Sequence, residues 1–188
     1  MIKIGITGSL ASGKSTASKI LSFRKGPLFS ADKAVKELYQ NKYFKSLVGK
    51  RFKIKNNNRI KKSLKALILE DKENINKLEK IIHPLVRKKM INFTSRNKNR
   101  KFLFYEIPLL IESKLMRYFN VLIFIKAKKR LRLKRFQLKN GDKKLFNFLN
   151  NKQMSDTKKI KFCDHIVVNE KNFSILKKNL IAIMEKYE

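Results

Sequence analysis

The chain has 188 residues, which is enough for one hydrophobic core with a small inserted subdomain and too few for two domains of ordinary size. Hydrophobic residues make up 43% and aromatic residues 10% of the sequence, a composition that excludes an intrinsically disordered chain. The formal net charge of +33 would suit a nucleic-acid partner, but Lys is spread through almost every segment, so we favour a lysine-rich solvated surface.

Short β-rich segments alternate with longer helical ones, which is typical of an α/β protein with helices on both faces of a parallel sheet. Two of these segments, 102–105 and 121–125, are apolar throughout, as strands buried on both faces should be, and we expect them at the centre of the sheet. In chain order, the five predicted strands are Lys3–Thr7, Pro27–Ser30, Lys101–Ile107, Val121–Ile125 and His165–Val168.

The predicted helices follow the first, second, fourth and fifth strands. They span about Lys14–Leu21, Lys33–Tyr39, Lys128–Leu138 and Ser174–Lys186. Between the second and third strands no segment is convincing as a strand, and the apolar stretches 64–69, 75–82 and 85–93 indicate helices. A helix there should stop at His83, because the residue before a proline avoids the α region.

The predicted organisation is a single domain with an insertion and a lid. The core takes residues of about 1–40, 97–125 and 145–188, and the helical insertion takes about 41–96. The stretch 126–144 is dense in Lys and Arg and lies between a strand and a helix, so we expect it to form a basic lid.

A glycine-rich motif follows the first predicted strand and precedes the first helix; it reads Gly8-Ser9-Leu10-Ala11-Ser12-Gly13-Lys14-Ser15-Thr16. Glycines permit backbone conformations closed to other residues, so successive N–H groups can surround a β-phosphate at the start of the helix. Lys14 can then reach the β- and γ-phosphates, and the Ser15 hydroxyl can ligate Mg²⁺. The motif in this context predicts a phosphate-binding loop for ATP and Mg²⁺ in a P-loop NTPase fold.

Two carboxylates lie where predicted strands end: Asp32 comes just after the second strand and Glu106 ends the third. Ligands of open α/β sheets collect at the carboxyl ends of the strands, so both are candidate site residues. Asp32 can accept or orient the proton of an attacking hydroxyl, or it caps a helix. The usual strand order of P-loop folds puts the end of the third strand beside the phosphate loop, where Glu106 can hold a Mg²⁺-bound water or a substrate group, or it is a solvent-exposed carboxylate.

Pro108 should end the third strand, because a proline cannot continue the hydrogen-bond ladder. Leu109 and Leu110 then either turn over the pocket or pack in the core. On the predicted helix after the fourth strand lie Arg130, Arg132 and Arg135, where nucleotide kinases carry lid arginines that neutralise the charge of the transferring phosphoryl group.

Taken in order, these motifs resemble those of dephospho-CoA kinases, the enzymes that place the last phosphate on coenzyme A. The resemblance covers nearly the whole chain, and many kinases share its first motif, whereas the His-Pro and Pro-Leu-Leu segments are more particular. The segments that carry it are Gly5–Thr16, Ser30–Asp32, Leu78–Pro84, Glu106–Glu112, Gln153–Ser155 and Cys163–Asn169.

This resemblance implies phosphorylation of the ribose 3′-hydroxyl of dephospho-CoA, with Asp32 acting on that hydroxyl. It implies that His83 contacts the substrate in a CoA-binding insertion, although a lone His at a helix end is usually a cap or a surface residue. Arg87, one turn later, is a candidate partner for an anionic substrate group or part of a solvated helix face. Of the arginines, Arg135 aligns best with the lid arginine of the family. The resemblance also implies that Asn169 contacts the adenine of ATP, although Asn169 as a turn residue needs no such role.

The chain departs from the family pattern at three positions. Ser30 stands where the family usually has an Asp, so we expect Asp32 to carry the essential function. Glu106 stands where Asp is common, and its longer side chain makes direct metal contact less secure. Lys139 replaces the next basic residue of the lid, which keeps the charge but loses the planar fork of a guanidinium.

The remaining expectations concern partners and location. The single cysteine, Cys163, fits a reducing compartment, and neither a signal-like leader nor an apolar run of about 18 residues is present, so we expect a cytoplasmic protein without a membrane partner. ATP and dephospho-CoA are the expected partners of a monomer or weak homo-oligomer. The alternatives are a related P-loop nucleoside or nucleotide kinase, and a nucleic-acid-binding NTPase, which no nucleic-acid-binding signature supports.

Overall fold

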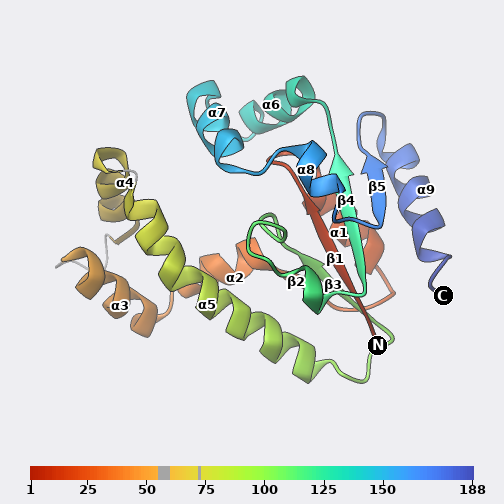
Figure 1. The fold of residues 1–188 in the computed structure, drawn as a ribbon, viewed down its shortest axis with the longest axis horizontal. Helices are drawn as coiled ribbons and strands as arrows, with labels where there is room; N and C mark the ends of the chain where they lie inside the picture. The colour runs from red at the N-terminus through yellow and green to blue at the C-terminus, as the bar shows by residue number, and fades with distance from the viewer. Residues whose placement is uncertain (55–59, 72) are drawn as a thin grey trace. The chain divides into compact units, whose positions relative to one another are not determined.

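The computed structural model describes residues 1–54, 60–71 and 73–188, which divide into two compact units (Figure 1). The first unit combines Met1–Ser30 with Asn97–Glu188, and the second is Ala31–Arg96. The first unit contains β1 (Ile2–Gly8), α1 (Lys14–Ser22), β2 (Leu28–Ser30), β3 (Phe102–Glu106), the 3₁₀ helix η2 (Met116–Tyr118), β4 (Val121–Lys126), α6 (Lys129–Gln137), α7 (Lys143–Lys152), α8 (Asp156–Ile160), β5 (His165–Val168) and α9 (Phe173–Met184).

The five strands form one parallel sheet in the order β2-β3-β1-β4-β5. This confirms the predicted five-stranded α/β fold, and each predicted strand agrees with the observed one within one residue at either end. The two apolar strands, β3 and β4, are interior as expected, and β1 lies between them. Residues 102–106 and 121–125 are all buried, which is why neither strand shows the alternation of a half-exposed strand.

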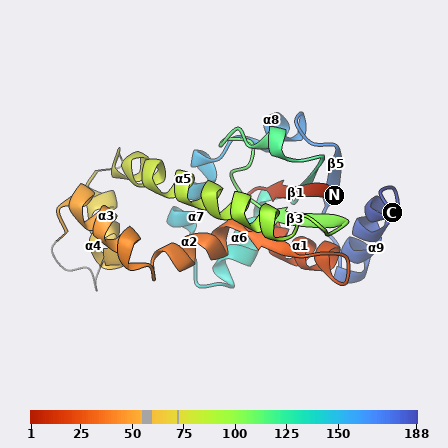
Figure 2. The same cartoon turned by 90° about the horizontal axis from the view of Figure 1, so that it is seen from below.

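Helices cover both faces of the sheet. On one face α1 packs against α9, and apolar residues of both helices join those of the strands in a single core cluster. Figures 1 and 2 show α8 on the opposite face, where it contacts β4. The parallel strands direct their carboxyl ends to one edge of this sheet, which is where β1 leads into the glycine-rich motif.

The second unit is helical, as predicted for the region between the second and third strands. Its elements are α2 (Ala31–Leu38), α3 (Lys42–Phe52), α4 (Ile60–Glu70) and α5 (Glu73–Arg96). A separate apolar cluster holds them together, and its buried members are Leu38, Phe44, Val48, Ile60, Leu64 and Leu78. None of the described helices, in either unit, is long and apolar enough to cross a membrane.

The expectation that a helix stops at His83 is wrong, because α5 continues through Pro84. A proline inside a helix removes one backbone donor and crowds the preceding turn, at a cost of about 3 kcal/mol. Aliphatic side chains on both sides of the proline offset this cost by packing against the apolar cluster of the second unit. They are Ile81, Ile82, Leu85 and Val86.

Candidate functional site

The glycine-rich motif forms the loop between β1 and α1. Gly8 closes the strand with φ +150°, and a Cβ there would lie 2.4 Å from the carbonyl oxygen of Ile125 on the neighbouring strand. Gly13 has φ +98° at the entry to α1, and Ala11 also has a positive φ of 58°. The loop therefore has left-handed turns at the start of a helix, the arrangement that directs backbone N–H groups at a phosphate.

Asn169 lies against this loop just after β5. Its Nδ2 donates a hydrogen bond of 2.8 Å to the carbonyl oxygen of Ser12, and a Cβ on Gly13 would approach that nitrogen to 2.1 Å. Asn169 is buried, and its hydrogen bond to Ser12 supports the loop. An adenine contact of Asn169 stays a prediction.

Gly13→Ala should lower the free energy of unfolding by about 2 kcal/mol or more, because the new methyl group meets Asn169 and the backbone is left-handed. Ala11→Gly in the same loop should be neutral or stabilising by up to about 1 kcal/mol, since it relieves a positive φ. Urea denaturation of the two variants and the wild type measures both effects. Equal destabilisation by the two substitutions would contradict this account of the loop.

Lys14 and Ser15 begin α1, and their side chains have partners nearby. Lys14 is 8% exposed, and its Nζ donates to the carbonyl oxygen of Ser9 at 2.8 Å, so the ammonium lies over the loop. The Ser15 hydroxyl donates to Oε1 of Glu106 at 2.5 Å. Glu106 pairs with Ile6 in the sheet register, which places the end of β3 beside the start of the loop as predicted.

The Ser15 and Glu106 oxygens fit a Mg²⁺ ion. Mg²⁺ prefers oxygen ligands, keeps several waters, and usually takes only one or two protein groups together with substrate phosphates. The described residues contain no cluster of three or more His, Cys, Asp or Glu that could hold a metal by themselves. A hydroxyl and a buried carboxylate beside a phosphate loop are the kind of partial donor set that a Mg²⁺-nucleotide requires.

Arg135 lies on α6 and reaches the phosphate loop. Its guanidinium donates to the carbonyl oxygen of Asn169 at 3.0 Å and to that of Ser12 at 3.4 Å. The predicted lid segment therefore contributes a cation beside the loop, although its lid role stays a prediction. Lys139, two residues beyond the end of α6, is exposed.

Arg132 has a role that the sequence did not indicate. It is buried, and its guanidinium donates to the carbonyl oxygen of Leu10 at 3.3 Å and to Oδ1 of Asn150 at 2.8 Å. Burial lowers the pKa of Arg132, while nearby Asp156 acts to raise it. Arg132 differs from the exposed Arg130 because it lies on the buried side of α6. The many cations of this stretch give no signal in the sequence for which of them is buried.

Two further side chains near the loop were also missed. Gln153 accepts a hydrogen bond of 2.9 Å from the backbone N–H of Leu10, and Asp156 accepts one from the hydroxyl of Ser9. Gln153 belongs to a segment that carries the family resemblance, and this was the available signal. Asp156 had none, because an Asp in the first turn of a helix has an ordinary explanation.

After β3 the chain turns at the predicted position. Pro108 follows the strand, and its carbonyl oxygen accepts a hydrogen bond of 3.1 Å from the hydroxyl of Thr7. Leu110 is fully buried and belongs to the core, whereas Leu109 is partly exposed. Of the two leucines, Leu109 is thus the accessible one.

The other predicted substrate residues belong to the second unit. Asp32 is exposed in the first turn of α2, one residue inside the helix, so it does not occupy the N-cap position. His83 and Arg87 are both exposed on α5, and their spacing of four residues puts them on the same helix face. The loop, Glu106, Arg135 and Asn169 come together within the first unit.

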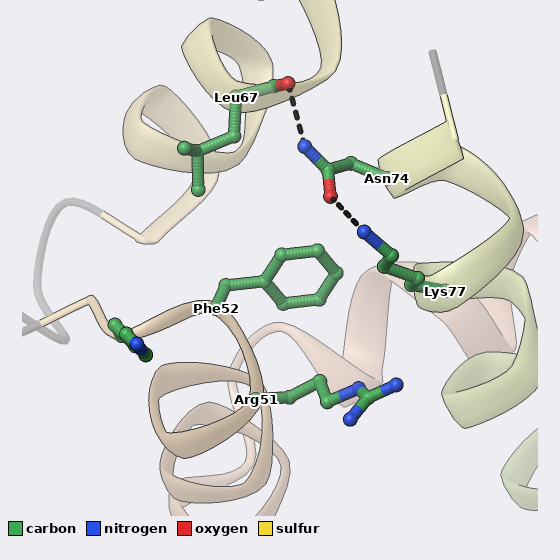
Figure 3. Close-up of a pocket in the computed structure, with 6 residues that line it drawn as sticks. Arg51, Phe52, Leu67, Asn74 and Lys77 are labelled. Atoms are coloured by element: carbon green, nitrogen blue, oxygen red, sulfur yellow. Dashed lines mark hydrogen bonds between the residues drawn. The ribbon is translucent and has the colours of Figure 1, made fainter. Parts of the chain in front are cut away.

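A pocket of about 290 Å³ also lies in the second unit. It is lined by Arg51, Phe52, Lys53, Leu67, Asn74 and Lys77. Figure 3 shows Asn74 of α5 between Leu67 of α4 and Lys77 of its own helix: its Nδ2 donates to the carbonyl oxygen of Leu67 at 2.9 Å, and Lys77 donates to its Oδ1 at 3.3 Å. None of the predicted substrate residues lines the pocket. The side-chain amide of Asn74 already donates a hydrogen bond that joins α5 to α4.

Cys163 is half-buried before β5, and its thiol donates to the carbonyl oxygen of Lys159. Burial, with a smaller contribution from Asp164 and against that of Lys159, raises the pKa of the thiol to about 11. The native protein should therefore react with iodoacetamide at pH 8 about 100-fold more slowly than the urea-unfolded chain, because only the thiolate reacts. Mass spectrometry follows the alkylation, with Cys163→Ser as the blank. Similar rates in both states would contradict the raised pKa.

Comparison with known proteins agrees with this geometry. The family model described as dephospho-CoA kinase matches residues 2–174. The dephospho-CoA kinase of Bartonella quintana is 34% identical over 187 residues, covering 97% of this chain and 96% of that protein. A crystal structure from Thermus thermophilus superposes with a TM-score of 0.83 at 26% identity over 98% of this chain and 97% of the other. The solved structure of dephospho-CoA kinase from Campylobacter jejuni superposes with a TM-score of 0.69 at 27% identity, covering 98% of this chain and 96% of the other. The chain belongs to the dephospho-CoA kinase family.

Proposed function

We propose that this kinase transfers the γ-phosphoryl group of ATP to the ribose 3′-hydroxyl of dephospho-CoA, giving coenzyme A and ADP. The observation that carries the proposal is the complete phosphate loop with Ser15 bonded to Glu106, in a chain that matches dephospho-CoA kinases over nearly its full length. The loop and the carboxylate support phosphoryl transfer from a nucleotide. The family supports dephospho-CoA as the acceptor, and this step would be the last in coenzyme A biosynthesis.

The loop N–H groups and Lys14 would bind the β- and γ-phosphates of ATP, and Arg135 would add a second cation. Ser15 and Glu106 would hold Mg²⁺, with Glu106 contacting it directly or through a water. Bound there, Mg²⁺ would neutralise phosphate charge. Because little covalent chemistry is needed from a kinase, these residues would act by positioning the phosphates and by electrostatic stabilisation.

On the acceptor side, Asp32 would accept or orient the proton of the 3′-hydroxyl. Its exposure leaves the carboxylate accessible to a substrate. His83 and Arg87, on one face of α5, would contact the acceptor, with Arg87 suited to a phosphate group. Pro108 and the partly exposed Leu109 would line the acceptor site, and the buried Leu110 would shape it from the core.

A coupled assay tests this proposal directly. The purified protein is incubated with ATP, Mg²⁺ and dephospho-CoA, ADP release is followed, and coenzyme A is identified by mass spectrometry. Stoichiometric ADP and coenzyme A are expected. Phosphorylation of nucleosides or nucleotides without turnover of dephospho-CoA would favour a related kinase, and hydrolysis stimulated by DNA or RNA with a steep salt dependence would favour a nucleic-acid-dependent NTPase.

A further inference from the structure

Residues 153–159, which we term the bracket segment, connect the phosphate loop with the chain that follows β3. The loop side of this segment consists of two hydrogen bonds: Gln153 accepts from the N–H of Leu10, and Asp156 accepts from the hydroxyl of Ser9. Both partners precede the part of the loop that leads into α1. The bracket segment thus holds the first half of the loop by side-chain contacts.

The other side of the bracket segment consists of an ion pair between a fully buried lysine and a mostly buried glutamate, whose side chain is 20% exposed. Lys159 is fully buried, and its Nζ lies 2.6 Å from Oε1 of Glu112 and 3.5 Å from the carbonyl oxygen of Pro108. The same carboxylate oxygen accepts a hydrogen bond of 3.1 Å from the backbone N–H of Met154. Lys159 therefore links the bracket segment to both ends of the stretch 108–112.

The carbonyl oxygen of Pro108 is where the two sides meet. It accepts from Lys159 and also from the hydroxyl of Thr7, which lies in β1 immediately before the phosphate loop. The stretch that is proposed to contact the acceptor is fixed to the strand that carries the nucleotide loop. Removing Lys159 would leave Thr7 as the described hydrogen-bond donor to this oxygen.

Stability gives no reason to bury this ion pair. Full burial of the Lys159 ammonium has a desolvation cost of several kcal/mol, partial burial of the Glu112 carboxylate adds a smaller one, and apolar residues of similar volume are often as stable or more stable. The second carboxylate oxygen of Glu112 is buried and has no hydrogen-bond partner among the described residues, which adds to the cost. Unlike an apolar contact, this ion pair is directional. The Lys159 ammonium contacts both Glu112 and the carbonyl oxygen of Pro108, and the Glu112 carboxylate also accepts from the N–H of Met154.

We propose that Lys159 is a positioning residue for phosphoryl transfer, which acts through its ion pair with Glu112 to fix the spacing between the phosphate loop and the 108–112 stretch. It touches neither substrate. Its contribution is to keep the reacting groups within the narrow range of geometry that transfer requires, where a displacement of about 1 Å can cost about 100-fold in rate. This proposal rests on the proposed function only in taking dephospho-CoA as the acceptor substrate.

The test separates positioning from folding with a double substitution. Lys159→Met alone leaves the mostly buried Glu112 carboxylate without its cation and should destabilise the protein. The double variant Lys159→Met/Glu112→Gln is therefore made as well, which removes both charges and keeps an acceptor for the N–H of Met154. The double variant should melt within a few degrees of the wild type and bind a non-hydrolysable ATP analogue within about threefold of wild-type affinity. Its kcat should fall at least tenfold. The control is Lys158→Met, which removes an exposed lysine of the same helix and should leave kcat unchanged.

A double variant that melts like the wild type and keeps wild-type kcat would overturn the proposal. An equal fall in kcat in the double variant and in the Lys158→Met control would overturn it as well. Should the double variant unfold, kcat of Glu112→Gln decides, because this change removes the ion pair and keeps an oxygen acceptor for the N–H of Met154. A folded Glu112→Gln protein with wild-type kcat would equally overturn the proposal. All variants are assayed with the acceptor that the wild type phosphorylates. Failure of dephospho-CoA as acceptor therefore shows in the wild type alone, whereas failure of the positioning role shows only in the comparison between variants.

Discussion

Replacing Asp32 with Asn should lower kcat by about 10²- to 10⁴-fold, the usual contribution of a positioned general base, and should leave the affinity for ATP nearly unchanged. Asn has almost the same shape and cannot accept the proton of an attacking hydroxyl. Because Asp32 is exposed in the first turn of α2, the fold should tolerate the change, at a cost of about 0.3–1 kcal/mol for the lost interaction with the helix dipole.

Steady-state kinetics with saturating ATP and dephospho-CoA, together with titration of an ATP analogue, check this expectation. Glu37→Gln is the matched control, because Glu37 is an exposed acid on the same helix and its ion pair with Lys89 is a surface contact. The control should keep wild-type kcat. Loss of ATP binding in Asp32→Asn would instead assign Asp32 a role in holding the metal or the helix, and unchanged kcat would remove it from the catalytic residues.

Replacing Lys14 with Met should lower kcat/KM by about 10²- to 10³-fold, as expected when one preorganised cation is removed from a developing charge. The methionine keeps the apolar stem in its buried place but loses the ammonium, which lies over the loop on the carbonyl oxygen of Ser9. Unlike Asp32→Asn, this variant should also bind the ATP analogue more weakly, because the same cation contacts the phosphates in the ground state.

The control for Lys14 is Lys19→Met, an exposed lysine of the same helix α1. It should match the wild type in activity and in nucleotide affinity, which separates a local effect from a change in the overall positive charge. Thermal melting of both variants identifies any loss of fold. Wild-type nucleotide affinity in a folded Lys14→Met would be inconsistent with a phosphate-binding loop.

The sequence alone was sufficient for the strands of the sheet, because each carries a local signal. Strands β3 and β4 are continuous apolar runs, and β1 leads directly into the glycine-rich motif. The phosphate loop was predictable for the same reason, since its glycines, Lys14 and Ser15 are contiguous and their spacing is fixed by the phosphate they bind. Glu106 was placed correctly beside the loop because the usual strand order of P-loop folds puts β3 next to β1.

The helical unit shows where a local rule fails. The rule that a helix ends before a proline considers only the backbone of one turn, and it predicted a stop at His83. The 24-residue helix α5 continues because side chains on both sides of Pro84 share one apolar cluster, and packing outweighs the loss of a single hydrogen bond. Competition between a local cost and a distributed gain cannot be evaluated before the partners of the helix are known.

The supports of the site depend on tertiary structure. Arg132 contacts Leu10 across 122 positions of sequence, and Asn169 contacts Ser12 across 157. In the sequence, Arg132 is one cation among many in the stretch 126–144, and Lys159 is one of 47 basic residues. Burial distinguishes Arg132 and Lys159 from most of the other basic residues of the chain. Which side chains are buried depends on how the helices pack in the tertiary structure.

Strand pattern and one contiguous motif thus determined a P-loop nucleotide-binding fold, because phosphate binding and buried strands both leave signals over a few neighbouring residues. The particular family was indicated by the resemblance of several further segments along the chain. Only the tertiary structure showed that Ser15 bonds to Glu106, that Asn169 and Arg132 support the loop, and that Lys159 pairs with Glu112. These contacts join residues far apart in sequence. The parallel pairing brings the carboxyl ends of the strands to one edge, and the order β2-β3-β1-β4-β5 sets which of those ends are neighbours.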